Sequence, residues 1–271
     1  MRPVLLGRLL PTVLALTLSA VALAAANGPA GSARERLPDL DQEPPRDLEI
    51  TVARSGDQPV YRLGFRSAVR NVGRGPLVIT GRRSQADAAK MTADQVIERA
   101  GAPRAVVHGV GKLRYVVSPD HRHWHLLRFD RYQLRRAGGH ETLVADRKTG
   151  FCLGDRYAVP KQLRAAAPQP RYTSRCGLGD PRLTGIAEGI SVGYGDDYGP
   201  TLEGQYLRLT GLPSGRYVLV HRVNANRRLR ELRYGNNAAS LLLDLRWDDG
   251  QPFIQVLRSC PRTDRCDRPI G

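Results

Sequence analysis

Short apolar runs broken by turn residues dominate the chain and predict strands. These runs are Leu48–Val52, Val60–Phe65, Leu77–Thr80, Ala105–Val110, Leu113–Val117, Tyr206–Leu209, Tyr217–Val223 and Leu241–Leu245. Turn signals rich in Gly and Pro, such as those at residues 73–76 and 212–215, separate them. Many short strands between such turns are typical of an antiparallel β-sandwich. We therefore predict an all-β fold with long loops and one or two short helices.

One segment departs from this pattern and predicts a helix near Met91–Ala100. Thr92 and Gln95 have the spacing of a capping box, in which two side chains satisfy the first amides of a helix. Val96 and Ile97 give the segment an apolar face.

The stretch from Gly150 to Asp197 predicts long loops laid over the sandwich. It holds many Gly, Pro and Arg residues, and its apolar positions show little periodicity. Loops held by a rigid scaffold commonly carry binding and catalytic residues. We therefore expect part of the functional site in this stretch.

The first 26 residues have the layout of a secretory signal peptide. Arg2 and Arg8 give a positive start, and an apolar stretch from Leu9 to about Ala26 ends in small residues. The alternative is a retained membrane anchor, but no charged stop-transfer cluster follows at once. We predict cleavage near residues 24–26, a linker at 27–36, a single domain at 37–271, and secretion without a later membrane span.

The chain is strongly basic, with a formal net charge of +16. The leader contains two arginines and no acid, so the secreted part carries about +14. Such a charge favours acidic partners, such as anionic cell-surface polymers or an acidic protein. Nucleic acid is not expected, because neither an RNA-binding aromatic pattern nor a basic recognition helix is visible.

Four cysteines fit an oxidising compartment. Cys260 and Cys266 are close enough in sequence to close a small loop, and Cys152 and Cys176 would then pair across a longer one. Free thiols or metal ligation are the alternatives. Because no C-x-x-C spacing occurs, we predict two disulfides.

The sharpest chemical signal is the alternating pattern His121, His123 and His125. Side chains alternate between the two faces of a strand, so these three imidazoles would point one way, and Arg122 and Trp124 the other. Converging neutral imidazoles suit Cu, Zn, Ni or Fe. A polar strand face without a metal is the alternative. Three ligands would leave coordination positions open, which favours chemistry over a closed structural site.

Further motifs follow these histidines in a fixed order. Phe129 and Tyr132 form an aromatic pair, Lys148 opens the segment Lys-Thr-Gly-Phe-Cys-Leu, and Tyr198 lies in Asp-Asp-Tyr-Gly. Together with the His-x-His-x-His strand, this order resembles the catalytic domain of the lysyl oxidase family. The resemblance extends, with gaps, from Leu37 to about Asn237.

The resemblance implies a copper-dependent amine oxidase. Copper would bind the three histidines, and Lys148 and Tyr198 would crosslink into lysine tyrosylquinone, the built-in cofactor of the family. The substrate would be a primary amine, such as a protein lysine, which is converted with O2 to an aldehyde, hydrogen peroxide and ammonia. The catalytic base should lie within hydrogen-bond reach of the substrate proton, and Asp130, Asp155 and Asp197 are candidates.

Two other classes compete with this interpretation. A non-catalytic extracellular copper-binding protein would keep the fold and the metal without forming the quinone. The presence of both Lys148 and Tyr198 favours the enzyme. A zinc hydrolase lacks the glutamate partner of an H-E-x-x-H motif.

The sequence also departs from the family pattern. The interval from His125 to Phe129 is one residue shorter than in animal members, and at most two disulfides can form. Tyr194 is a nearby rival for the crosslinked tyrosine. Tyr198 fits better because the family segment reads Asp-x-Tyr-Gly.

The same resemblance suggests a calcium site. Its ligands would be Asp39, the Leu40 carbonyl, Glu231, Asn236 and Asn237, all oxygen donors as a hard cation prefers. However, Arg233 stands where the family has an acid, and its guanidinium could replace the ion and pair with Asp39 or Glu231. Both interpretations stay open at this point.

Overall fold

Every regular element in the described part of the chain is a β-strand. The computed structural model describes Met1 and residues 34–145, 150–160, 162–202 and 204–268. Within these residues all strand pairs are antiparallel and form three sheets. The predicted all-β, antiparallel sandwich-like fold is confirmed.

The first sheet contains six strands, and we call it the histidine sheet because His123 and His125 lie on its edge strand β8. In spatial order they are β12 (Gly185–Ile190), β5 (Leu77–Arg82), β6 (Lys90–Arg99), β7 (Ala102–Val117) and β8 (Arg122–Leu126), with β1 (Glu35–Arg36) also pairing with β6. The second sheet is built around the long central strand β4, and we call it the tyrosine sheet because Tyr198 lies on its strand β13. Its order is β11 (Tyr157–Ala158), β13 (Tyr194–Tyr198), β4 (Gln58–Asn71) and β14 (Tyr206–Arg208), and β2 (Leu40–Gln42) and β3 (Arg46–Ser55) also pair with β4.

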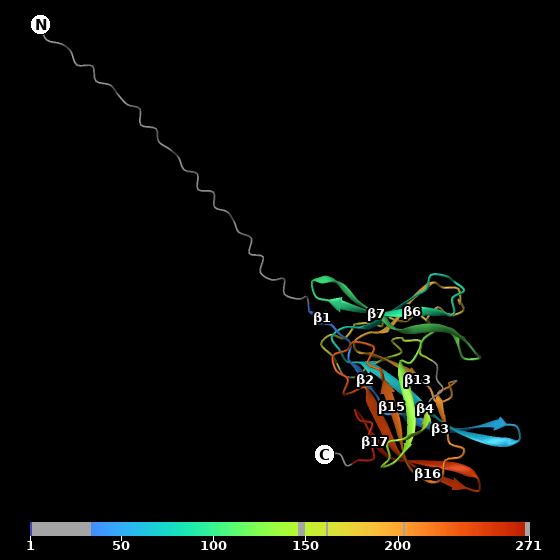
Figure 1. Cartoon of the computed structure of the whole chain (residues 1–271). Coiled ribbons are helices and arrows are strands. Elements are labelled where there is room, and N and C mark those ends of the chain that lie inside the picture. Colours follow the sequence, from blue (N-terminus) through green and yellow to red (C-terminus); the bar gives the residue numbers. More distant parts are fainter. Residues whose placement is uncertain (2–33, 146–149, 161, 203, 269–271) are drawn as a thin grey trace. The chain divides into compact units, whose positions relative to one another are not determined.

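The five-stranded sheet supplies much of the core. Its order is β10 (Thr142–Ala145), β9 (Asp130–Arg136), β15 (Gly215–Val223), β16 (Ala238–Asp248) and β17 (Gln251–Cys260), and β16 and β17 form a long hairpin beside β15 (Figure 1). Leu219 and Leu243 face the main core, whereas Val218 and Leu242 pack beneath the C-terminal Cys260–Cys266 loop. Two buried faces explain why β15 and β16 are nearly continuous apolar runs.

The helix predicted near Met91–Ala100 is wrong, because these residues form β6. Met91, Ala93 and Ile97 are buried at alternate positions, and β6 pairs with β5 on one side and β7 on the other. The period-two burial outweighs the local capping pattern. Gln95 does not cap a helix; its side chain exchanges hydrogen bonds with the main chain of Arg230 instead.

The stretch from residue 150 to 197, predicted as long loops, also contains three short strands: β11, β12 and most of β13. Strand β12 has few apolar residues to give it a period. Its Gly189 has no room for a side chain, since a Cβ atom there would lie 2.2 Å from the Leu77 carbonyl oxygen. Glycine in this strand therefore serves a close approach of two backbones.

Both predicted disulfides are confirmed. Cys152 bonds to Cys176, and Cys260 bonds to Cys266. The first bridge fastens the segment after Lys148 to the loop before β12. The second closes the small C-terminal loop against β15 and β16.

The predicted signal peptide and most of the predicted linker lie outside the described residues, so both remain predictions. Ala33–Gly271 forms one compact unit, in which Glu35 and Arg36 already pair with β6. In the described part of the chain, no helix has the length and apolar character needed to cross a membrane.

Candidate metal centre and tyrosine site

Strand β8 carries His123 and His125 at the edge of the histidine sheet, and His121 immediately precedes the strand. It pairs with β7, with His123 opposite Val116 and His125 opposite Arg114. Because side chains alternate along a strand, Trp124 points away from the histidines. It packs edge-on against Tyr115 with ring centroids 5.7 Å apart, and the Arg83 guanidinium lies 4.6 Å from its ring centroid.

The three imidazoles converge. Their ring centroids are 4.7 to 5.4 Å apart, and one nitrogen from each ring lies within 4.8 Å of the other two. Nε2 of His123 and Nε2 of His125 are 2.7 Å apart. His121 and His125 are buried, whereas His123 is half-buried, so the trio opens toward solvent on one side.

This donor set fits a copper ion. Two imidazole nitrogens at hydrogen-bond distance must share a proton or a cation, because two facing lone pairs repel each other. Three imidazoles are suitable ligands for copper and leave positions open for water or oxygen. The histidines therefore form a candidate metal site.

A loop completes the outer edge of the histidine strand. The Trp124 amide donates to the Cys176 carbonyl at 2.9 Å, and the Trp124 indole donates to the Asp180 carbonyl at 3.1 Å. The Gly179 amide donates to the Arg122 carbonyl at 2.7 Å. These bonds fix the backbone that carries the imidazoles, and the Cys152–Cys176 bridge holds the loop itself.

The segment that follows Lys148 joins the same edge. Lys148 lies outside the described residues, but Phe151, three positions later, exchanges two backbone hydrogen bonds with Leu126 at the end of the histidine strand. Gly150 contacts this strand so closely that a Cβ atom would lie 2.8 Å from the Cβ of His125. Glycine at position 150 therefore lets the two segments meet.

Phe151 connects the histidine strand to Tyr198. The Phe151 and Tyr198 rings pack edge-on, with centroids 4.9 Å apart. Phe129 and Tyr132, the aromatic pair noted in the sequence, are buried, and their ring centroids lie 5.7 and 6.4 Å from that of Phe151. The described site therefore brings together the histidine, lysine and tyrosine motifs, apart from Lys148 itself.

The Tyr198 hydroxyl lies between two acceptors. It is 2.8 Å from the Cys152 carbonyl oxygen and 3.0 Å from Oδ2 of Asp196. Burial raises the pKa of the Tyr198 phenol well above its usual range, and the Asp196 carboxylate raises it further. The phenol thus keeps its proton at neutral pH, with Asp196 at hydrogen-bond distance.

Sequence reasoning missed Asp196 as a site residue. It precedes Tyr198 by two positions on β13, so both side chains lie on the same face of the strand. The alternation used for the histidines could have identified it. Asp196 is buried, and its Oδ1 lies 3.5 Å from the Arg156 guanidinium.

The three proposed bases are engaged elsewhere. Asp130 lies 2.6 Å from the fully buried His221, and Asp155 accepts three backbone amides, from Arg171, Tyr172 and Ser191. Asp197 forms an ion pair with Arg66 at 2.6 Å. Tyr194, the rival tyrosine, starts the same strand as Tyr198, and Asp196, Tyr198's partner, lies between them.

Glu188 lies beneath the disulfide and was also missed. Its Oε2 is 3.1 Å from Sγ of Cys176 and 3.4 Å from the Leu153 amide nitrogen. Complete burial raises the pKa of this carboxyl well above the ordinary value of 4.5, with nearby Asp196 adding to the shift. Burial therefore favours the protonated form of Glu188.

We expect the free energy of unfolding to fall as pH rises above about 4.5, because unfolded Glu188 then releases the proton that the folded state retains. Glu188→Gln should remove this part of the pH dependence and raise stability at neutral pH. Urea unfolding between about pH 5 and pH 8 measures both effects. Glu141→Gln, at an exposed position, is the matched control. Equal pH slopes in wild type and Glu188→Gln would contradict a neutral Glu188.

The residues suggested for calcium also lie together. Asn236 donates to Oδ1 of Asp39 at 2.8 Å, and Asn237 donates to Oε1 of Glu231 at 2.6 Å. Glu231 also accepts the Leu40 amide at 3.0 Å. Desolvation raises the pKa of Glu231 to about 7.

Arg233 places a positive charge in this cluster. Its guanidinium lies 2.7 Å from Oδ2 of Asp39, the carboxylate that a cation would need. Oδ1 of Asn236 and Oδ1 of Asn237 are buried without a hydrogen-bond partner in the described residues, and these are oxygens that calcium could use. The ion pair accounts for the Asp39 charge without a metal, and the calcium assignment stays a prediction.

The fold and the site define an all-β protein with a three-histidine candidate metal site joined to a partly buried tyrosine. The family model for lysyl oxidase matches residues 105–255, more than half of the chain. The chain therefore belongs to the lysyl oxidase family. No curated protein matches the chain in the sequence comparison.

Proposed function

We propose that this chain is a secreted copper-dependent amine oxidase that converts primary amines, such as peptidyl lysine, to aldehydes. One observation carries the proposal: the Phe151 segment joins the histidine strand by two backbone hydrogen bonds and packs on the Tyr198 ring at 4.9 Å. The lysyl oxidase motifs, which are far apart in sequence, thus converge. The family is in general copper-dependent, and the histidine trio suits copper.

When present, copper and the lysine tyrosylquinone made from Lys148 and Tyr198 supply the oxidation of the amine by O2, with release of hydrogen peroxide and ammonia. His121, His123 and His125 would hold the metal. Their strand is fixed on one side by β7 and on the other by the loop at residues 176–180. This support limits movement of the three rings relative to one another.

Asp196 would take the proton of the Tyr198 hydroxyl. Its Oδ2 is 3.0 Å from that oxygen, within reach for direct proton transfer. The raised pKa of Tyr198 shows why a base is needed, since the phenol does not ionise by itself at neutral pH. Asp196 is the carboxyl group that contacts the phenol, and Glu188 lies nearby.

Secretion and acidic partners belong to the same proposal. Two disulfides fit an oxidising compartment, and the basic chain would be attracted to acidic proteins and anionic cell-surface polymers. The non-catalytic alternative, an extracellular copper-binding protein, would share these features but lack the crosslink.

Peptide mass spectrometry of the copper-loaded protein under air separates the two functions. We expect the peptides that contain Lys148 and Tyr198 to be found joined, with the mass of the quinone crosslink. Protein kept free of copper should give the two peptides separately and serves as the control. Separate, unmodified peptides after copper loading in air would reject the quinone and leave a copper-binding role.

A further inference from the structure

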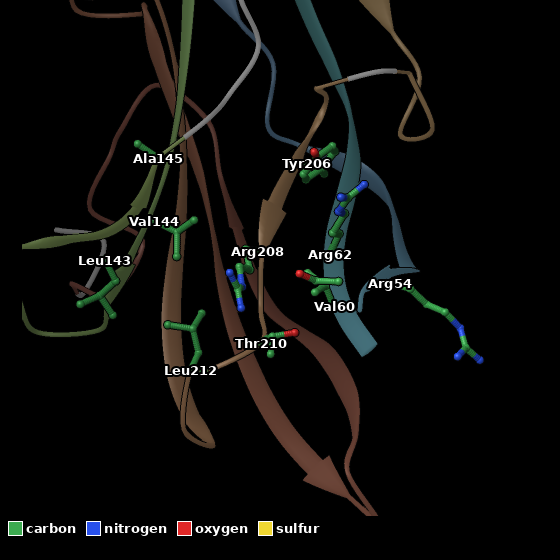
Figure 2. Close-up of a pocket in the computed structure, with 12 residues that line it drawn as sticks. Arg54, Val60, Arg62, Leu143, Val144, Ala145, Tyr206, Arg208, Thr210 and Leu212 are labelled. Carbon is green, nitrogen blue, oxygen red and sulfur yellow. The ribbon is translucent and has the colours of Figure 1, made fainter. Parts of the chain in front are cut away.

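A groove lies outside the histidine and tyrosine site, between two sheet edges. Its volume is ≈ 760 Å³, and its walls come mainly from β10, the β3–β4 hairpin, β14 and the turn after β14. Figure 2 shows Val144 of β10 and Leu212 facing Arg208 and Thr210, with Arg62 and Tyr206 beyond them, whereas Arg54 extends away from the group.

Strand alternation explains why arginines line this groove. On β4 and β14, Leu63 and Leu207 are opposite each other and fully buried in the core. The neighbouring pair, Arg62 and Arg208, is also directly opposite across the two strands and therefore points outward, into the groove. The inward leucines thus force two guanidiniums onto one short stretch of surface.

This pairing is electrostatically unfavourable by itself. Directly opposite side chains have Cβ atoms about 5 Å apart, and two like-charged residues in opposite positions destabilise a strand pair. Among the described residues, the groove lining contains no Asp or Glu, and neither arginine forms an ion pair with a carboxylate. Arg62 instead stacks over the Tyr206 ring at 4.3 Å. A bound anion would relieve the repulsion.

The remaining walls favour a peptide over a polysaccharide. Leu143, Val144 and Leu212 offer apolar surface next to the arginines, and Leu143 is 41% exposed. Among the described strands, β10 and β14 each pair on one side only, so main-chain groups on their other edges can bind an extended chain. A polypeptide with alternating acidic and apolar side chains can pair with the arginines, pack on the apolar side chains and bind the main chain of the strand edges.

We infer that this groove binds an acidic stretch of polypeptide, with Arg62 and Arg208 pairing with its carboxylates. The inference rests on the proposed function and names the occupant: an acidic segment of the protein substrate, docked away from the lysine that is oxidised. Tyr206 pairs with Gly64 and Tyr198 pairs with Ser67 on the same strand β4. Ser67 is three positions from Gly64, so the same alternation turns Tyr198 away from the arginines, and the groove is a docking surface on the other face of this sheet.

Binding is tested without copper, so that the result does not depend on oxidation. The probe is a fluorescein-labelled, lysine-free peptide of alternating Glu and Leu, and its Kd is measured by fluorescence anisotropy. The double variant Arg62→Gln/Arg208→Gln should bind about tenfold more weakly, as expected for the loss of two partly exposed ion pairs. Added salt should weaken wild-type binding more than binding to the double variant.

The matched control is Arg131→Gln/Arg216→Gln, which removes the same charge from exposed positions outside the groove lining. It should leave the Kd nearly unchanged. An equal loss in both double variants, or no loss in the groove variant, overturns the inference. So does polygalacturonic acid displacing the peptide at lower concentrations than unlabelled peptide, because the groove would then prefer a polysaccharide. Thermal unfolding checks the fold, and removing the arginine repulsion should not lower the Tm.

Turnover separates this inference from the proposed function. With copper-loaded protein and a lysyl peptide joined by a flexible Gly-Ser linker to the Glu-Leu segment, the groove variant should raise KM about tenfold and leave kcat unchanged; KM for the same peptide with Gln in place of Glu should not change. Peptide binding without any amine oxidation rejects the oxidase and keeps the groove. Oxidation with the same KM in wild type and groove variant rejects the groove alone.

Discussion

Tyr198→Phe is expected to abolish amine oxidation while leaving the fold intact. The variant keeps the ring that packs on Phe151 at 4.9 Å and loses only the hydroxyl between Asp196 and the Cys152 carbonyl. Without a phenol oxygen the ring cannot be converted to a quinone. Peroxide release with a primary amine should therefore fall at least ~10³-fold, to the background rate. No peptide crosslink to Lys148 should form.

The cost in stability should be small by comparison. Losing the hydroxyl removes hydrogen bonds worth about 1 kcal/mol each, and the buried Asp196 keeps a contact with Arg156. A lowered Tm with retained near-UV circular dichroism would fit this expectation. Copper content should stay at the wild-type level, because the three imidazoles that would hold the metal are unchanged.

Tyr194→Phe is the matched control. The residue lies on the same strand, four positions earlier, so the same atom is removed from a neighbouring phenol. This variant should retain turnover and the crosslink. Loss of activity in Tyr194→Phe with retention in Tyr198→Phe would assign the crosslink to Tyr194, and retention of activity in both would reject a tyrosine-derived cofactor.

The sequence pattern was sufficient for the strands with clear apolar runs, and it failed where two periods compete. Residues 91–100 carry both a capping pattern and apolar residues at alternate positions. Only the neighbours on both sides, β5 and β7, decide between helix and strand, and a local pattern does not contain them. Strand β12 was missed for the opposite reason, since its glycines leave almost no pattern at all.

The residues of the site also divide into those that the sequence could predict and those that it could not. The convergence of the three imidazoles follows from strand alternation alone, and Asp196 could have been found by the same rule from its position relative to Tyr198. Glu188 could not, because its burial depends on a disulfide and on a strand from another part of the chain. The candidate bases Asp130, Asp155 and Asp197 looked equivalent in sequence; their partners distinguish them.

His123→Ala is expected to remove most of the bound copper. His123 is the most exposed of the three imidazoles, so its truncation leaves no large cavity in the core. Loss of one nitrogen ligand should weaken copper binding at least about a hundredfold, because even changes to groups that only support a ligand cost up to that much. The metal content after dialysis, measured by inductively coupled plasma mass spectrometry, gives the result directly.

The control for this variant is His140→Ala. His140 is exposed, lies between β9 and β10, and contacts Arg265 near the C-terminus. The His140→Ala variant removes an imidazole that does not belong to the histidine trio, and its copper content should equal that of wild type. Because the proposed quinone is made by copper and O2, His123→Ala should also leave the Lys148 and Tyr198 peptides uncrosslinked. Unchanged copper content in His123→Ala would show that the metal, and with it the chemistry proposed for Tyr198, belongs elsewhere.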